Sequence, residues 1–152
     1  MGLEGRPDMA LFKFTKSILE DIPIDVYNHG KLKRDFTYID DLIKSIWLLS
    51  SKIPTNTIQE VDNYSDSLSE NAPYRIVNIG NSRPVELLKF IEAIESALGK
   101  RAKKNFMPMQ PGDVPITWAN VELLNDLIGF VPDTDVNIGV KNFVKWYKKF
   151  YI

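Results

Sequence analysis

Apolar residues recur at helical spacing in five separate stretches of this 152-residue chain, and the extended stretches between them are short and stand singly. Each of the five patterns places one apolar stripe along an amphipathic helix. The predicted helices cover residues 11–22, 42–49, 87–98, 120–128 and 136–150. The predicted extended stretches cover residues 24–27, 35–39, 74–79 and 102–108. Helices interspersed with single short strands predict the α/β class, as a small mixed α+β subdomain with a small sheet.

Residues that favour turns and helix ends mark the borders of these elements. Residues 28–31 read Asn-His-Gly-Lys and predict a turn, so the flanking stretches form a hairpin or a looser strand–loop–strand unit. Asp40 and Asp41 are expected to cap the second helix, because carboxylates accept hydrogen bonds from the free N–H groups of a first turn. Gly99 and Gly129 are expected to end the third and fourth helices, because glycine adopts the left-handed conformation that often follows a helix.

Residues 54–73 are rich in Asn, Ser, Asp, Glu and Thr and carry few large apolar side chains. A stretch of that length without its own periodicity is unusual inside a compact domain. The length of the chain supports one ordinary domain and is short for two. We therefore predict a single domain over residues 1–152, with a polar surface excursion at about residues 54–73.

The composition excludes several classes of site and partner. The chain has no cysteine and one histidine, His29, which excludes disulfides, thiolate zinc sites, cysteine nucleophiles and histidine-rich metal centres. Nineteen Lys and Arg against 20 Asp and Glu give a net charge of −1, whereas a dedicated nucleic-acid binder normally carries a basic excess. The charge balance therefore predicts no nucleic-acid partner. Apolar runs are short and the signal-peptide pattern is absent, so we also expect no membrane partner and a cytoplasmic location.

The spacing of glycines argues against a dinucleotide site in this chain. A site for nicotinamide adenine dinucleotide (NAD) needs closely spaced glycines between a strand and a helix, so that backbone N–H groups reach the pyrophosphate. The eight glycines here are scattered, and the best strand–glycine–helix unit, residues 76–87, contains only Gly80. One glycine cannot fill the three roles of that fingerprint, so Gly80 is expected to form a structural turn.

Tyr27-x-x-x-Lys31 matches a pattern found in short-chain dehydrogenases, in which a helix places both side chains on one face. There the ammonium group lowers the pKa of a tyrosine. Here Asn28, His29 and Gly30 separate the two residues, and a turn rather than a helix is predicted. We therefore assign no catalytic residue to this chain, and we expect His29 to be a solvated side chain.

Two basic runs remain. The first, Lys100 to Lys104, follows a helix C-terminus, where cations complement the helix dipole, and this favours a structural role. In the second, Arg34 stands where a loop meets an extended stretch, and its planar guanidinium suits bidentate contact with a phosphate. The chemistry alone leaves open that Arg34 is a surface side chain paired with Asp35 or with solvent.

Five segments, in their order and spacing, resemble one family. They are Gly5-Arg6-Pro7-Asp8-Met9-Ala10, Arg34-Asp35-Phe36-Thr37-Tyr38-Ile39-Asp40-Asp41, Asn78-Ile79-Gly80-Asn81-Ser82, Met107-Pro108-Met109-Gln110-Pro111-Gly112-Asp113, and Gly129-Phe130-x-Pro with Phe143-Val144-x-Trp146-Tyr147. Together they resemble the C-terminal part of extended short-chain dehydrogenase/reductase nucleotide-sugar epimerases. The similarity is greatest to the UDP-glucuronate 4-epimerase branch, which includes enzymes of capsular polysaccharide biosynthesis.

The resemblance implies a division of labour. In such enzymes an N-terminal Rossmann domain holds NAD and the catalytic side chains, while a smaller C-terminal region binds the UDP part of a UDP-sugar. Hydride leaves sugar C4 for the nicotinamide, the 4-keto sugar reorients, and the hydride returns on its other face. This sequence matches only the UDP-binding region. The resemblance therefore implies that the chain alone binds no NAD and is inactive, and that its partners are a UDP-sugar and the missing Rossmann half.

The same resemblance implies substrate-binding roles for five residues. Arg34 would contact the pyrophosphate, and Asp113 would accept hydrogen bonds from the ribose hydroxyls. The strand that holds Asp25 and Tyr27 would meet the uracil, largely through backbone groups, and Arg6 lies in a loop that approaches the phosphates or the sugar. Many relatives carry an arginine just before the Pro-Gly-Asp segment, where this chain has neutral residues. Arg34 would therefore provide more of the positive charge that binds the diphosphate.

Other interpretations stay open. A related sugar-nucleotide dehydratase or decarboxylase shares the fold and the cofactor, and a non-catalytic nucleotide-binding or interaction module would act without NAD. Nucleic-acid binding through Lys100 to Lys104 is disfavoured by the net charge. A chain without its Rossmann half leaves apolar surface exposed, so self-association is expected.

Overall fold

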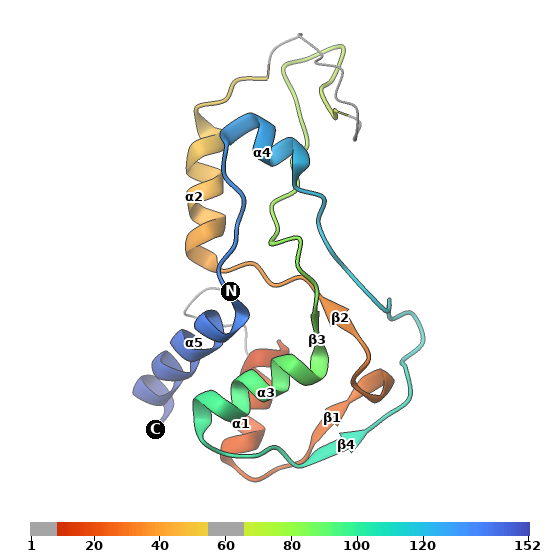
Figure 1. Cartoon of the computed structure of the whole chain (residues 1–152), viewed down its shortest axis with the longest axis vertical. Helices are drawn as coiled ribbons and strands as arrows, with labels where there is room; N and C mark the ends of the chain where they lie inside the picture. The colour runs from red at the N-terminus through yellow and green to blue at the C-terminus, as the bar shows by residue number, and fades with distance from the viewer. Residues whose placement is uncertain (1–8, 55–65) are drawn as a thin grey trace.

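The computed structural model describes residues 9–54 and 66–152 (Figure 1). Arg6 and residues 55–65 of the predicted polar excursion lie outside the described residues. The elements are α1 (Ala10–Leu19), β1 (Ile24–Val26), the 3-10 helix η1 (Tyr27–Gly30), β2 (Lys33–Arg34), α2 (Ile39–Ser50), β3 (Val85–Glu86), α3 (Leu87–Leu98), β4 (Lys104–Phe106), α4 (Glu122–Ile128) and α5 (Val136–Tyr151). Figure 1 shows α1, α3 and α5 gathered at one end of the molecule and α2 with α4 at the other.

Helices α1, α3 and α5 form the main hydrophobic core. The apolar stripes that the helical spacing predicts face inward here, and their burial stabilises the three helices against one another. The buried side chains are those of Leu11, Phe12, Ile18, Phe90, Ala93, Ile94, Val140, Phe143, Val144 and Tyr147. Phe12 meets Tyr147 edge-on with ring centroids 5.0 Å apart, an arrangement that aromatic pairs favour. The packed α3 holds β3, which directly precedes it in the chain.

Three helix ends follow the local chemistry of the sequence. Gly99 (φ +71°) and Gly129 (φ +63°) adopt the left-handed conformation and end α3 and α4, as predicted. At the start of α5 the carboxylate of Asp135 accepts a hydrogen bond of 2.8 Å from the N–H of Asn137. This bond satisfies one of the N–H groups that a helix start leaves without an intrahelical partner.

The start of α2 differs from the prediction. Tyr38 is the N-cap residue, without a side-chain capping bond, and Asp40 and Asp41 lie within the first turn. Their negative charges still complement the positive end of the helix dipole. The Oδ2 atom of Asp41 accepts a hydrogen bond of 3.0 Å from the N–H of Thr134. The prediction that Asp40 and Asp41 cap the helix is therefore wrong, and Asp41 instead ties α2 to the segment before α5.

The strands form two small sheets. β1 pairs in parallel with β4, with Ile24 opposite Lys104, and β2 pairs antiparallel with β3. Ile116 bridges in parallel to Lys33, on the edge of β2 that faces away from β3. Because β1 and β2 pair with different strands, the predicted hairpin is wrong and a looser strand–loop–strand unit forms. Its second strand is Lys33–Arg34 and not the predicted stretch over residues 35–39, of which Ile39 already belongs to α2. The predicted small mixed α/β fold is confirmed.

The predicted strand over residues 74–79 is wrong, because no strand of the described residues pairs with it. The exposure still alternates as it does along a strand, with Tyr74 and Ile76 exposed and Arg75 and Val77 half-buried. Arg75 holds this stretch to the described end of the polar excursion through a bidentate ion pair with Asp66, both bonds being 2.8 Å long. The stretch is therefore extended and anchored, but its backbone forms no ladder.

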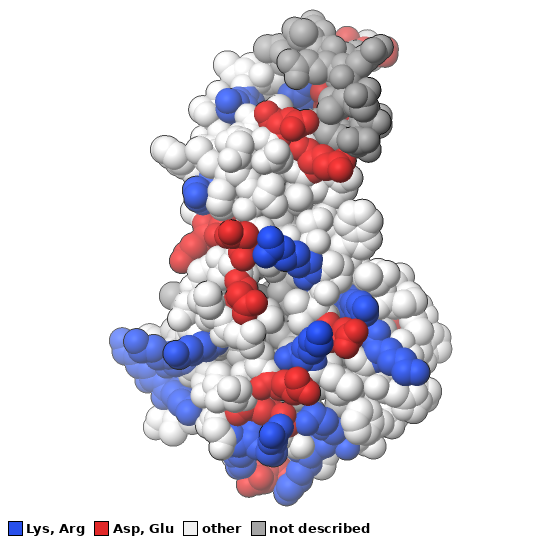
Figure 2. Space-filling view, viewed as in Figure 1, with Lys and Arg blue, Asp and Glu red and all other residues white. Residues whose placement is uncertain are grey.

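Charged side chains of both signs share the surface. Figure 2 shows Lys and Arg next to Asp and Glu over the lower half of the view, and mostly uncharged residues around α2. Such interspersed charges produce no large field of one sign. No described helix combines the length and the apolar character that crossing a membrane requires.

Candidate functional site

Arg34 lies on β2, flanked by β3 on one edge and by the segment around Ile116 on the other. Its Nη1 atom donates to the carbonyl oxygens of Lys33 at 2.9 Å and of Val114 at 2.8 Å. Its Nη2 atom donates to Oδ1 of Asp113 at 3.2 Å. The side chains of Arg34 and Asp113 are each 31% exposed, so the ion pair is open to a ligand from solvent.

Asp113 closes a tight turn over residues 110–113. Its N–H donates to the carbonyl oxygen of Gln110 at 3.2 Å, and Pro111 and Gly112 occupy the two central positions. Gly112 has φ +84°, and proline followed by such a glycine is the signature of a type II turn. The turn delivers Asp113 to Arg34 although the two residues are 79 positions apart in the chain.

Asp35, which the sequence leaves open as a partner of Arg34, has a different role. Its Oδ2 atom accepts hydrogen bonds from the N–H groups of Ser82 at 2.9 Å and Ala119 at 3.3 Å. Gly80 packs closely here, because a Cβ atom at this position would lie 2.5 Å from Cβ of Ala119 and 2.9 Å from Oδ2 of Asp35. Asp35 thus ties two loops to the end of β2. Sequence reasoning missed this role because backbone N–H groups leave no signal in the sequence.

Asp25 is exposed on β1, and its Oδ1 atom accepts a hydrogen bond of 2.8 Å from Nδ2 of Asn105 on β4. The N–H of Ile24 and the carbonyl oxygen of Val26 bond to residues on the β4 side. In a parallel pair, alternate residues of a strand bond to the same neighbour. The N–H and the carbonyl oxygen of Asp25 therefore lie on the edge of β1 away from β4, where no strand of the described residues pairs with them.

Tyr27 is half-buried at the start of η1, and it does not share a helical face with Lys31. Asn28 and His29, which lie between them, have φ of +49° and +48°, in the left-handed region. The geometry that lets an ammonium group act on a tyrosine across one helical turn is thus missing. Among the described residues, no hydrogen bond or ion pair links Tyr27 or Asp25 to the pair of Arg34 and Asp113. His29 is exposed.

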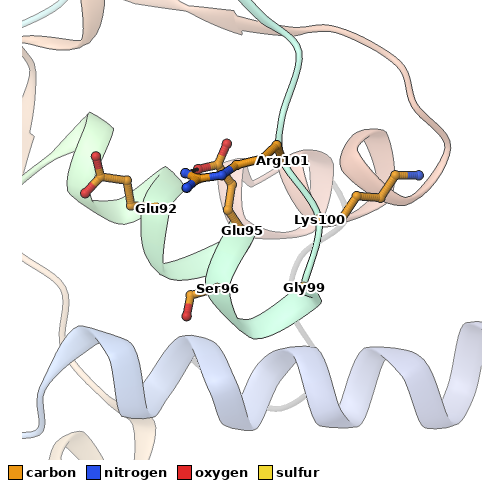
Figure 3. Close-up of a pocket in the computed structure, with 6 residues that line it drawn as sticks. All are labelled: Glu92, Glu95, Ser96, Gly99, Lys100 and Arg101. Atoms are coloured by element: carbon orange, nitrogen blue, oxygen red, sulfur yellow. Dashed lines mark hydrogen bonds and ion pairs between the residues drawn. The ribbon is translucent and has the colours of Figure 1, made fainter.

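A hollow with a volume of about 550 Å³ lies at the C-terminal end of α3 (Figure 3). Its lining residues are Glu92, Glu95, Ser96, Gly99, Lys100 and Arg101. Figure 3 shows Arg101 reaching over Glu95, whereas Lys100 points away from it. The Nζ atom of Lys100 donates to the carbonyl oxygen of Leu19 at 2.9 Å and to Asp21 at 2.8 Å. Lys100 therefore serves the C-terminal end of α1, and the structural role predicted for it is confirmed.

Glu95 is the buried carboxylate of this hollow, with 4% of the residue exposed. Its oxygens accept hydrogen bonds from Lys104, from Arg101 and from the N–H of Ala102. Burial raises the pKa of Glu95, but the hydrogen bonds from Lys104 and Ala102, together with the charge of Lys104, outweigh it and leave the pKa below its ordinary value. These cations therefore hold the segment that leads from α3 into β4.

The segment around Gly80 does not fit the pyrophosphate of NAD. Gly80 belongs to the best strand–glycine–helix pattern in the sequence, but Ala119 and Asp35 occupy the space beside its Cα atom. The backbone there has no further glycine that would let a pyrophosphate approach. Gly80 thus allows two segments to pack closely and does not serve as the glycine of a dinucleotide site.

Comparison with known proteins identifies relatives of the chain. Residues 2–64 match the model of the NAD dependent epimerase/dehydratase family. Over 97% of its length the chain is 52% identical to the protein CapI of Staphylococcus aureus and 49% identical to a probable UDP-glucuronate 4-epimerase of Rhizobium meliloti. It covers 44% and 43% of those two proteins, so it spans less than half of the relatives that it matches.

A solved structure shows the same relation. The UDP-glucuronic acid 4-epimerase of Bacillus cereus, in complex with UDP-glucuronic acid and NAD, matches 99% of this chain with a TM-score of 0.79 and 30% identity. The match covers 43% of that structure. By sequence and by fold, the chain matches part of the NAD dependent epimerase/dehydratase family, and its resemblance to UDP-glucuronate 4-epimerases is confirmed.

Proposed function

We propose that this chain is the UDP-sugar-binding portion of an NAD-dependent epimerase that interconverts UDP-glucuronate and UDP-galacturonate at C4. The observation that carries the proposal is the contact between Arg34 and Asp113, which joins a cation and a carboxylate from segments 79 residues apart. A nucleoside diphosphate presents matching groups side by side, because its diphosphate anion adjoins a ribose with two hydroxyls. A guanidinium suits the first group and a carboxylate suits the second.

Arg34 binds the diphosphate in this proposal. Two backbone carbonyl oxygens, of Lys33 and Val114, hold its guanidinium in one orientation before any ligand arrives. A donor that is already oriented loses less conformational entropy on binding, which favours affinity. The ordered guanidinium of Arg34 is therefore suited to a phosphate at this position.

Asp113 and the edge of β1 bind the nucleoside. The Asp113 carboxylate accepts hydrogen bonds from the ribose hydroxyls, and its partial exposure leaves it accessible to them. The N–H and carbonyl oxygen of Asp25 supply a donor and an acceptor for uracil, with Tyr27 two residues further along the chain. Arg6 is proposed to approach the phosphates or the sugar.

Catalysis belongs to the other half of the enzyme. NAD accepts and returns hydride in such reactions, and Gly80, the one glycine of the best strand–glycine–helix pattern in the sequence, is packed closely against Ala119 and Asp35. The residues of this chain therefore bind and orient the substrate. They leave proton and hydride transfer to the Rossmann half, and the chain by itself has no epimerase turnover.

The Rossmann half is the proposed protein partner, and α2 with residues 74–79 forms the surface for it. We call this surface the α2 face; its exposed apolar side chains are those of Ile43, Ile46, Trp47, Tyr74 and Ile76. Each of these five large apolar side chains is at least 49% exposed, and in soluble proteins such side chains mark an interaction site where they form one patch. The extended stretch also leaves its backbone free of a ladder, as the edge strand of a larger sheet does before it is paired. A second copy of the chain covers the same surface when the Rossmann half is absent.

Binding of UDP tests the proposal directly. We expect isothermal titration calorimetry to detect weak binding of UDP to the folded chain, and Arg34→Ala to weaken it by about 1.5–3 kcal/mol, the usual contribution of a hydrogen bond to a charged group. Arg101→Ala is the matched control, because it removes an arginine from the hollow beside Glu95 and leaves β2 intact. Absence of UDP binding, or equal effects of the two substitutions, would contradict the proposal.

A further inference from the structure

Both cations of β2 are paired with a carboxylate. The Nζ atom of Lys33 lies 3.3 Å from Oε1 of Glu86, and the Nη2 atom of Arg34 lies 3.2 Å from Oδ1 of Asp113. Consecutive strand residues project to opposite faces, so the two ion pairs lie on opposite faces of β2. On the face of Arg34, the ion pair presents a neutral surface to an approaching anion.

The donors of Arg34 are only partly used. A guanidinium has five N–H donors, and the bonds to Lys33, Val114 and Asp113 take three of them. Among the described residues, the N–H of Nε and one N–H of Nη2 meet no acceptor. A phosphate oxygen that takes these two donors shares Nη2 with the Asp113 carboxylate. Two anions that share one nitrogen lie a few ångströms apart and repel each other.

We infer that Asp113 is a specificity-determining residue that acts by exchange of partners, an inference that rests on the proposed function. In the ligand-free chain its carboxylate neutralises Arg34. When a nucleoside diphosphate binds, the diphosphate takes the guanidinium, and the displaced carboxylate turns to the ribose hydroxyls of the same ligand. The carboxylate thus has a hydrogen-bonding partner both before and after binding.

The exchange distinguishes nucleoside diphosphates from inorganic anions. Pyrophosphate alone must displace or approach the Asp113 carboxylate and offers no hydroxyl in return. A carboxylate left without a partner near a phosphate costs free energy, because it has lost its cation and faces a like charge. A nucleoside diphosphate avoids this cost through its ribose. Specificity here comes from a repulsive element as well as an attractive one.

Titration of pyrophosphate and UDP into the wild-type chain and the Asp113→Asn variant tests the exchange. Asparagine keeps the shape of the side chain but removes its charge. We expect the variant to bind pyrophosphate about threefold more tightly, a modest gain typical of a partly exposed ion pair. We expect it to bind UDP about tenfold more weakly, because hydrogen bonds from the ribose to a charged acceptor are lost. The two changes in opposite directions are the signature of exchange.

Glu86→Gln is the matched control, because it removes the partner of the other cation on β2 and leaves Arg34 and Asp113 in place. This variant should keep the wild-type ratio of UDP affinity to pyrophosphate affinity. Unchanged or weaker pyrophosphate binding by Asp113→Asn would show that Asp113 is a fixed brace and would overturn the inference. Wild-type chain that binds neither ligand would instead overturn the proposed function.

A second test changes the ligand, and its first measurement uses the wild-type chain. With the wild-type chain, 2′,3′-dideoxyuridine diphosphate should bind about tenfold more weakly than UDP, because it gives the displaced carboxylate no hydroxyl. With Asp113→Asn the two nucleotides should bind about equally. Equal binding of both nucleotides to the wild-type chain would overturn the inference, whether or not the variant folds.

Discussion

Helices α2 and α3 have the same length of 12 residues and each carries an apolar stripe, yet they differ in what they bury. α3 buries Phe90, Ile91, Ala93, Ile94 and Glu95 against its neighbours. α2 buries only Ser45, and it exposes 71% of Trp47. An apolar stripe therefore shows that a helix needs a partner, but it does not show that the partner lies in the same stretch of chain.

The two regions also relate differently to the relatives of the chain. α1, α3 and α5 complete one another, whereas the α2 face has no cover among the described residues. The chain spans 44% of CapI, so more than half of that relative lies outside the match and is available to cover such a face. The packed region is thus expected to set the stability of the chain, and the α2 face is expected to set its association.

The largest effect on stability should follow from one substitution made in both regions. Ile94 on α3 is fully buried, and Ile43 on α2 is 56% exposed. We expect Ile94→Ala to lower the free energy of unfolding by about 2–5 kcal/mol, because it removes buried methyl groups and leaves a cavity. The matched Ile43→Ala should change it by less than about 0.5 kcal/mol. Urea denaturation followed by circular dichroism measures both, and equal losses would remove the contrast between the helices.

A smaller effect is expected from the buried charge within the packed region. Glu95→Gln should lower the free energy of unfolding by about 1–3 kcal/mol, because Lys104 and Arg101 lose their charged acceptor. Glu92→Gln is the matched control, since Glu92 lies on the same helix and in the same hollow but is exposed. If both substitutions lowered the free energy of unfolding equally in urea denaturation, the ion pairs of Glu95 would stabilise the fold no more than the exposed Glu92 does.

The same residue predicts a dependence of stability on pH. The pKa of Glu95 in the folded chain is lower than its ordinary value of 4.5. A carboxyl group whose folded pKa is lowered stabilises the fold above its unfolded pKa, and this contribution is lost as the pH falls through the folded pKa. At pH values below 4.5, the free energy of unfolding of the wild-type chain should therefore decrease more steeply with falling pH than that of Glu95→Gln. Parallel curves for the two proteins would contradict the assignment.

Elements that depend on local chemistry could be predicted from the sequence. The stripes of α3 and α5 follow from apolar residues three and four positions apart, and Gly99 and Gly129 mark helix ends by their conformational freedom. The turn before Asp113 follows from Pro111 and Gly112 in the same way. In each case the physical cause lies within a few residues of the effect.

Pairings across the chain could not be predicted in this way. β1 and β4 are three residues long and lie about 80 positions apart, so neither carries enough pattern to specify its neighbour. Residues 74–79 have the alternation of a strand, but a strand also needs a ladder partner, which no described segment provides. Local pattern was sufficient to indicate an extended conformation and insufficient to indicate pairing.

The candidate site likewise has residues that the sequence indicated and contacts that it did not. The resemblance indicated Arg34 and Asp113 through their motifs, but not their direct contact. The anchors of Arg34 are the carbonyl oxygens of Lys33 and Val114, and every residue type carries a carbonyl oxygen. The backbone contacts of Asp35 were missed for the same reason. Whether these residues bind UDP stays a prediction until the titrations are made.

The smallest expected effect on stability, and the sharpest on association, concerns Trp47. If a second copy covers the α2 face, Trp47→Ser should weaken self-association about tenfold, which corresponds to about 1.4 kcal/mol, and should leave the free energy of unfolding within about 0.5 kcal/mol of the wild-type value. Phe150→Ser is the matched control, because Phe150 is also an exposed aromatic residue, 62% accessible, but lies on α5. Light scattering over a range of concentrations measures the association. Monomeric wild-type chain, or equal effects of the two substitutions, would show that exposure of aromatic residues alone does not distinguish α2 from the packed region, and the α2 face would then lose its role as an interface.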